Sequence, residues 1–170
     1  GVDKKLVGDM ILANSGYDYG EFCTEYPGLY GLVKQTLGLC KNGLVGYDGS
    51  MWSADSPKWD NALFEVLDHH GMAEELLDNP IYYKLLVKWI PSMLHKSLEI
   101  IKKSGKYSMD DMIWIPIVLN LPIPKYDILL VDEYQDLNRS QQELMFRAGQ
   151  RLVAIGDPHQ AIYGFAGADA

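Results

Sequence analysis

The sequence has no excess of basic residues. Its 170 residues include 15 Lys and Arg against 23 Asp and Glu, which gives a formal net charge of -8 at pH 7. Small nucleic-acid-binding modules usually have a basic balance, because their partner is a chain of phosphates. The composition therefore excludes a surface that is basic throughout. Any contact with nucleic acid is expected to be local, or to need segments beyond these residues.

Cysteines and long apolar runs are also scarce. Cys23 and Cys40 are too few for a disulfide framework, and they lack companions at metal-ligand spacing. No apolar run approaches the roughly 20 residues that span a membrane, and the start of the chain lacks the apolar core of a signal peptide. These absences predict an intracellular protein with no membrane partner, in the cytoplasm of a bacterium or phage-infected cell, or in a eukaryotic nucleus.

Residues 1–106 are predicted to be mainly helical. The segment 29–37 places apolar residues on one stripe at helical spacing. Asn79 and Pro80 are typical of the cap and the first residue of a longer helix, which we expect Pro91 to kink or interrupt. With 48% apolar residues, the chain can bury an ordinary core.

A further helix is predicted after residue 107. Ser108 is its expected cap, and Asp110 and Asp111 are interpreted as favourable charges in the first turn. Pro116 leaves the end of this helix undetermined. Residues 121–125 are expected to form an extended linker.

The pattern changes at Tyr126. "YDILLV" and "RLVAIGD" are apolar runs of strand length, and each is interpreted as a strand buried on both faces. Between them, "NRSQQELMFRAGQ" is typical of a helix capped by Asn138, with Ser140 and Glu143 as an alternative capping box. Strand, helix and strand within about thirty residues form a βαβ unit. The two strands are therefore expected to be parallel, with a right-handed crossover.

Both predicted strands end on acidic residues. Asp132 and Glu133 follow the first strand, and Asp157 follows the second. Since the carboxyl ends of parallel strands share one edge of a sheet, at least three carboxylates are expected along one rim. One acid there can hold a hydrated Mg²⁺, and its neighbour can orient or deprotonate an attacking water. An ordinary solvated strand end is the alternative interpretation.

Two longer motifs resemble those of a known enzyme family. "DEYQD", residues 132–136, and "GDPHQAIYGFAGA", residues 156–168, resemble motifs II and III of the UvrD/Rep/PcrA-like superfamily 1 DNA helicases, in order and in separation. The four apolar residues before Asp132 also match the Walker B pattern of P-loop NTPases. The resemblance implies an α/β fold: a partial RecA-like P-loop domain with parallel strands over residues 107–170, preceded by a mainly helical, 1B-like insertion over residues 1–106.

The same resemblance implies ATP and Mg²⁺ as cofactors and assigns roles to individual residues. Asp132 would serve the Mg²⁺ of MgATP through water, and Glu133 would be the carboxylate that activates the attacking water. Gln160 would sense the γ-phosphate and couple it to the DNA site. Gln135 and Asp136 would complete the nucleotide-binding motif and tie it to the coupling network.

Tyr163 and Phe165 are the residues that the resemblance places under single-stranded DNA. Aromatic faces stack on any base, at roughly 1–3 kcal/mol per base, without reading the sequence. Core packing is the alternative interpretation for both. The family often has Arg where this chain has Ala166. Loss of that cation puts strong DNA binding by this piece in doubt.

The phosphate-binding loop of such enzymes is absent from the sequence. No GxxxxGK[ST] segment occurs, and the family's later motifs are also missing. We therefore expect an internal fragment of a longer helicase, inactive by itself. Its expected partners are single-stranded DNA, the missing P-loop segment and the second RecA-like domain of the parent chain. Without the P-loop strand, "YDILLV" would expose an apolar edge, and self-association through that edge is a hypothesis.

Three functions stay open at this point. The first is part of an ATP-dependent DNA helicase that translocates on single-stranded DNA and unwinds duplexes, with 3'-to-5' polarity implied by the family alone. The second is a non-catalytic, helicase-like module that binds DNA or a protein. The third is the helicase part of a helicase-nuclease. All three keep the carboxylates of residues 131–136 at a nucleotide site.

Overall fold

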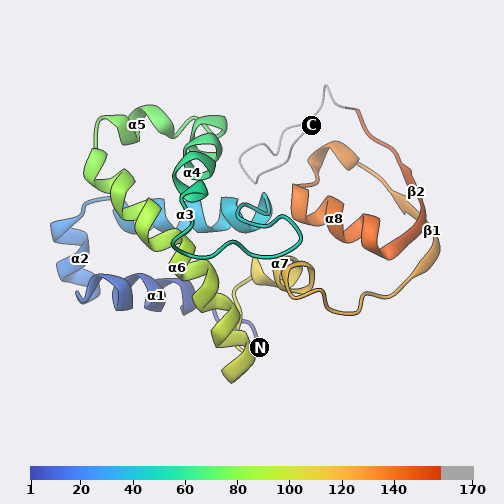
Figure 1. The fold of residues 1–170 in the computed structure, drawn as a ribbon, viewed down its shortest axis with the longest axis horizontal. Helices are drawn as coiled ribbons and strands as arrows, with labels where there is room; N and C mark the ends of the chain where they lie inside the picture. The colour runs from blue at the N-terminus through green and yellow to red at the C-terminus, as the bar shows by residue number, and fades with distance from the viewer. Residues whose placement is uncertain (158–170) are drawn as a thin grey trace.

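The computed structural model describes residues 1–157 (Figure 1). In this part of the chain, six helices precede residue 106: α1 (Leu6–Ser15), α2 (Tyr19–Glu25), α3 (Leu29–Asn42), α4 (Lys58–His69), α5 (Ala73–Leu77) and α6 (Pro80–Ser104). After them come α7 (Asp111–Val118), β1 (Tyr126–Val131), the 3-10 turn η1 (Tyr134–Asp136), α8 (Arg139–Ala148) and β2 (Gly149–Ala154). The helical character expected for residues 1–106 is confirmed, and the division into two domains at residue 106 stays a prediction.

The core lies among the helices. One hydrophobic cluster takes residues from α1 to α7, and Trp59, Trp114 and Phe22 are its largest fully buried apolar side chains. Burying one large apolar side chain stabilises a fold by roughly 1.5–3 kcal/mol. Because Trp114 and its neighbours on α7 join this cluster, α7 packs with the helical part of the chain. Among the described residues, no helix is long and apolar enough to cross a membrane.

Pro91 was expected to kink or interrupt its helix, and of these two outcomes the interruption does not occur. Asn79 and Pro80 do begin α6 as expected, but the helix then runs from Pro80 to Ser104 as one element with Pro91 inside it. Proline removes one helical hydrogen bond and crowds the preceding turn. Here Pro91 is buried beside Ile90 and Met93, which are fully buried. Packing of this face outweighs the local preference.

The start of α7 also differs from the prediction. Asp110, not Ser108, occupies the position before the first helical residue, and it makes no capping hydrogen bond with its side chain. Ser108 instead donates from its backbone N–H and its hydroxyl to the Asp111 carboxylate, at 2.7 and 2.8 Å. The helix continues past Pro116 to Val118.

The predicted βαβ unit is present as a two-stranded parallel sheet. Tyr126 pairs with Gly149 and Val131 with Ala154, and α8 connects the two strands. Asn138 caps α8 through a capping box with Gln141, as expected for the first of the two predicted caps. The alternative box is absent, because the Ser140 hydroxyl bonds elsewhere and Glu143 pairs with Arg147.

The prediction that both strands are buried on both faces is wrong for these residues. Tyr126, Ile128 and Leu130 are 54%, 53% and 70% exposed, and of the β1 side chains only that of Val131 is buried. Figure 1 shows the sheet at the periphery, with α8 between it and the helical part. A continuous apolar run indicates burial only where both faces are covered, and among residues 1–157 one face of this sheet is left to solvent.

Candidate functional site: the acidic segment after β1

The acidic segment, residues 132–136, begins where β1 ends. Asp132 and Glu133 are exposed, and the backbone N–H of Glu133 donates to Oδ1 of Asp132 at 3.0 Å. Glu133 has φ 51° and ψ 43°, the left-handed conformation. Residues other than glycine adopt it at a cost of roughly 1–2 kcal/mol, and such strain is concentrated at functional sites. The turn η1 then directs the chain into α8.

Gln135 connects the acidic segment to the chain after β2. Its Nε2 donates to Oε2 of Glu133 at 2.5 Å, and its Oε1 accepts from the backbone N–H of Asp157 at 3.1 Å. A second link runs from the N–H of Tyr134 to the carbonyl of Ile155, at 2.9 Å. Gln135 is buried, so both ends of its amide are used inside the protein. The acidic segment and residues 155–157 therefore form one hydrogen-bonded unit at the carboxyl edge of the sheet.

Gly156 is required by the closeness of this contact. A Cβ added at Gly156 would lie 2.2 Å from Oε1 of Gln135 and 3.0 Å from the backbone nitrogen of Tyr134. Glycine is the residue that permits such a close approach of two backbones. Gly156 stands at the start of motif III, and its contact with Gln135 was not predicted from the sequence. The signal was available, since a glycine directly after a predicted strand indicates a close approach.

The predicted carboxylates differ in their surroundings. Asp157 is held to Gln135 through its backbone, while Asp132 and Glu133 are exposed residues, and one oxygen of Glu133 accepts from Gln135. Asp136 is only partly exposed, and its Oδ1 is buried without a hydrogen-bond partner among the described residues. Asp136 lines a cleft together with Asp110 and Asn138.

No group of three or more His, Cys, Asp or Glu in residues 1–157 could hold a metal ion by itself. Mg²⁺ keeps several waters and is usually bound by one or two carboxylates together with substrate phosphates. Asp132 is suited to this, since it is exposed and its Oδ2 has no partner in the described part of the chain.

Gln160, Tyr163 and Phe165 lie outside the described residues, as does Ala166. Their roles in sensing the γ-phosphate and in stacking on DNA stay predictions. The structure shows how Asp157, which precedes these residues in the chain, is held: its backbone N–H donates to the side-chain oxygen of Gln135.

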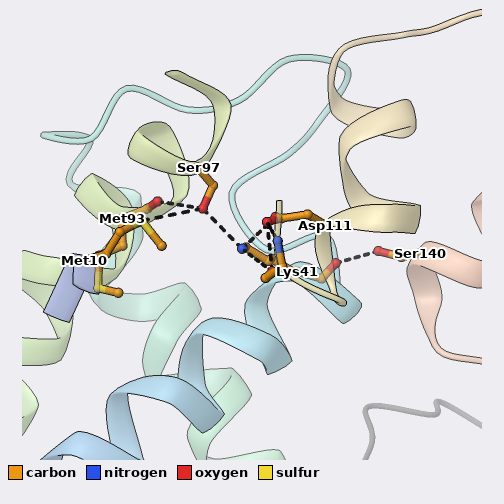
Figure 2. A network of polar contacts seen from close by, with 7 residues as sticks. Met10, Lys41, Met93, Ser97, Asp111 and Ser140 are labelled. Carbon is orange, nitrogen blue, oxygen red and sulfur yellow. Dashed lines mark hydrogen bonds and ion pairs between the residues drawn. The ribbon is translucent and has the colours of Figure 1, made fainter. Parts of the chain in front are cut away.

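Lys41 and Asp111 form a buried ion pair that was not predicted from the sequence (Figure 2). Nζ of Lys41 lies 2.7 Å from Oδ1 of Asp111, and the two side chains are 1% and 0% exposed. Asp111 was interpreted only as a charge at a helix start, and it does occupy the first turn of α7. The available signal was Lys41 itself, which follows Leu37 by four residues on the apolar stripe of α3.

Arg147 anchors the far end of α8. Its Nε donates to Glu143 at 2.7 Å, its Nη1 to the carbonyl of Ile117 at 3.0 Å, and its Nη2 to the hydroxyl of Tyr47 at 3.2 Å. The hydrogen bond with Tyr47 is the largest of the causes that raise the pKa of the Arg147 guanidinium. Arg147 thereby joins the end of α8 to the end of α7.

Part of the chain is similar in sequence to known DNA helicases. Residues 92–170 match the family model of the UvrD/REP helicase N-terminal domain. One ATP-dependent helicase/nuclease protein, from Carboxydothermus hydrogenoformans, is 36% identical over 101 residues, which are 54% of this chain and 9% of that protein. The ATP-dependent DNA helicase PcrA of Bacillus subtilis is 33% identical over 99 residues, or 52% of this chain and 13% of that protein.

A shorter match has a higher identity. The F-box DNA helicase protein 1 of Schizosaccharomyces pombe is 49% identical over 47 residues, which are 27% of this chain and 5% of that protein. No solved structure gives a significant match. The chain thus spans only a small part of the length of these relatives. Residues 92–170, less than half of the chain, are thus similar to the UvrD/REP helicase family.

Proposed function

We propose that this chain supplies the water-activating carboxylate and a Mg²⁺ ligand of an ATP-dependent DNA helicase that moves 3'-to-5' along single-stranded DNA. The observation that carries the proposal is the arrangement of Asp132, Glu133 and Gln135 at the carboxyl edge of a parallel strand pair. The relatives named as ATP-dependent DNA helicases support the same class. In this proposal the strand pair is part of a RecA-like domain.

Glu133 is the proposed general base. The amide of Gln135 holds one oxygen of its carboxylate at 2.5 Å, which fixes the direction of the side chain. Its exposure leaves the carboxylate accessible to a water molecule and a phosphate. A general base placed in this way contributes roughly 10²- to 10⁴-fold to a rate.

Asp132 is the proposed ligand of the Mg²⁺ that accompanies ATP. When bound, Mg²⁺ neutralises charge on the phosphate oxygens. Asp132 offers one hard oxygen to solvent, while its other oxygen is used by the backbone of Glu133. The two neighbouring acids therefore have different proposed roles: Asp132 would hold the metal through its waters, and Glu133 would accept a proton.

Gln135 is proposed to couple the nucleotide site to the DNA site. It bonds to Glu133 on one side and to the backbone of Asp157 on the other. Asp157 precedes Gln160, Tyr163 and Phe165 by only a few residues. A shift of the acidic segment during ATP hydrolysis would thus pull directly on the segment proposed to sense the γ-phosphate and to stack on bases.

Residues 1–170 are not expected to hydrolyse ATP by themselves. They contain no GxxxxGK[ST] loop to hold the phosphates. A P-loop segment and a second RecA-like domain, supplied from elsewhere, complete the site in this proposal. Turnover of MgATP by residues 1–170 alone would contradict this part of the account.

Strand displacement tests the proposal. A full-length protein that contains this chain and a P-loop is mixed with a labelled duplex that has a 3' or a 5' single-stranded tail. ATP-dependent release of the strand from the 3'-tailed duplex is expected. Tight binding of the same DNA without ATP turnover would replace the motor by a helicase-like binding module. Release from the 5'-tailed duplex alone would overturn the polarity.

A further inference from the structure

The end of α3 is joined to the helix that follows the acidic segment. The hydroxyl of Ser140, in the first turn of α8, donates a 2.5 Å hydrogen bond to the backbone carbonyl of Lys41 in the last turn of α3. Both residues are buried. The last carbonyls of a helix lack partners within the helix, so Ser140 completes the end of α3 from a position 99 residues further along the chain.

The side chain of Lys41 holds this carbonyl in place (Figure 2). Besides Asp111 at 2.7 Å, Nζ of Lys41 contacts the hydroxyls of Ser97 on α6, at 3.2 Å, and Ser108, at 3.5 Å. Lys41 lies near the C-terminus of α3 and Asp111 near the N-terminus of α7, which is where the helix dipoles favour these charges. Three helices therefore converge on one ammonium group.

A buried ion pair of this kind is a poor source of net stability. Removing two charges from water costs about as much as their attraction returns, whereas breaking the pair leaves one buried charge and is strongly destabilising. What the Lys41–Asp111 pair does provide is a defined position for the last turn of α3. That turn presents the carbonyl to which Ser140 is bonded.

Ser140 lies close to the acidic segment along a stiff stretch of chain. Only Leu137 and Asn138 separate η1 from α8, and Asn138 is fixed by reciprocal hydrogen bonds with Gln141, at 2.9 and 3.0 Å. A displacement of the first turn of α8 therefore moves Asp136 and Gln135 as well.

The geometry points to Ser140 as a positioning residue for the acidic segment, acting through the carbonyl of Lys41 and the Lys41–Asp111 pair. This inference rests on the function proposed for Asp132 and Glu133. Through its hydrogen bond to Lys41, Ser140 attaches the first turn of α8, and with it the segment that carries Asp132 and Glu133, to the helical part of the chain. A movement of α3 relative to the sheet is transmitted to the acidic segment through this hydrogen bond, which lies at the opposite end of α8 from the contacts of Arg147 with Ile117 and Tyr47.

Amide hydrogen exchange of residues 1–170 tests the link. Ser140→Ala removes the hydroxyl, and Ala is a better helix former, so α8 itself is not weakened. The carbonyl of Lys41 still accepts from the N–H of Leu44 at 3.3 Å. The amides of Tyr134 and Asp136, which are hydrogen-bonded in the acidic segment, are expected to exchange about tenfold faster, while the slowest amides of α6 keep their rates.

Ser104→Ala is the matched control. Its hydroxyl also donates to a backbone carbonyl, that of Ile100 on the same exposed helix end, but it joins no second element. It should leave the acidic segment unchanged. Unchanged exchange at Tyr134 and Asp136 in Ser140→Ala would overturn the inference. Equal acceleration in all helices would also overturn it, because that result reports a loss of global stability alone.

The double variant Lys41→Met/Asp111→Leu tests the contribution of the ion pair. It leaves neither charge buried without a partner, but the Ser108 N–H and hydroxyl lose their acceptor. The midpoint of unfolding should therefore fall, by less than in Lys41→Met alone. The amides of the acidic segment should still exchange faster. Unchanged exchange of the Tyr134 and Asp136 amides would show that the ion pair does not help to position the acidic segment. Neither measurement involves nucleotide, so the two proposals can fail separately. A parent protein without ATPase activity would not contradict the role of Ser140. Unchanged exchange in Ser140→Ala would not contradict the proposed ATPase.

Discussion

The side-chain oxygen of Gln135 accepts a hydrogen bond from the backbone N–H of Asp157, at 3.1 Å. The nitrogen of the same amide donates to Glu133. One buried amide therefore connects the proposed base to the chain that follows β2. This contact joins the two motifs that the sequence separates by about twenty residues of strand and helix, and it is where the account can be tested first.

Gln135→Ala should loosen the segment after β2. The Asp157 N–H loses its acceptor, so its exchange with solvent should speed up, and the free energy of unfolding should fall by about 1 kcal/mol. Hydrogen exchange and urea denaturation measure both effects. Gln35→Ala, on the exposed face of α3, is the control and should change neither. Equal exchange at Asp157 in both variants would show that Gln135 does not hold this segment.

Gly156→Ala should be destabilising, whereas Gly31→Ala should be stabilising. A Cβ at Gly156 meets Oε1 of Gln135 at 2.2 Å and two backbone nitrogens at 3.0 and 3.2 Å, so either the side chain or the backbone must move. A Cβ at Gly31 meets nothing within 4 Å, and Ala in a helix is favoured over Gly by roughly 1 kcal/mol. Thermal unfolding of both variants compares the same substitution in the two settings. A Gly156→Ala protein as stable as the original would contradict the close contact.

Lys41→Met should cost roughly 3–5 kcal/mol of unfolding free energy, because it leaves the Asp111 carboxylate buried without its partner. The exposed pair of Lys96 and Glu99, at 3.2 Å, serves as the comparison. Lys96→Met should change stability by no more than about 1 kcal/mol, since surface ion pairs contribute little. Urea denaturation gives both values. Similar losses in the two variants would mean that the Lys41 side chain is not held as the structure shows.

Cys23 should react with iodoacetamide long before Cys40. Cys40 is fully buried, and burial raises the pKa of its thiol to about 12, from an ordinary value of 9.0. The thiolate is the reactive form, so mass spectrometry should find one adduct on the folded chain, at Cys23, and two in denaturant. A first adduct at Cys40 would contradict the packing around α3.

The same shift predicts a dependence of stability on pH. The unfolded chain releases the Cys40 proton near pH 9, whereas the folded chain keeps it to about pH 12. The unfolded state therefore binds fewer protons in this interval, and stability falls as pH rises through it. Below pH 9 the contribution of this thiol is constant. Cys40→Ala should remove that part of the pH dependence, and denaturation between pH 8 and pH 11 measures the difference.

Local signals were sufficient for the βαβ unit. The apolar runs, the cap at Asn138 and the acids at the strand end are short-range features, and each appears in the structure where the sequence places it. The burial of the strands could not be predicted in the same way, because it depends on what covers the sheet. Tyr126 and Leu130 are apolar, yet among residues 1–157 they are left exposed.

Contacts between residues far apart in the sequence were the second feature that could not be predicted. Nothing in the sequence pairs Lys41 with Asp111, seventy positions away, although a lysine on an apolar stripe is a reason to look for a partner. Pro91 shows the reverse case. A strong local signal against a helix is overridden by the burial of its neighbours on α6.

The central claim is that the Glu133 carboxylate activates the water that attacks ATP. Its most direct test is the rate of ATP hydrolysis, stimulated by single-stranded DNA, in a full-length helicase that contains residues 1–170, with and without Glu133→Gln. Glu99→Gln, on the exposed face of α6, is the control. The account predicts that Glu133→Gln lowers the rate by roughly 10²- to 10⁴-fold while MgATP still binds and the control keeps its rate. An undiminished rate in Glu133→Gln would contradict the role given to this carboxylate.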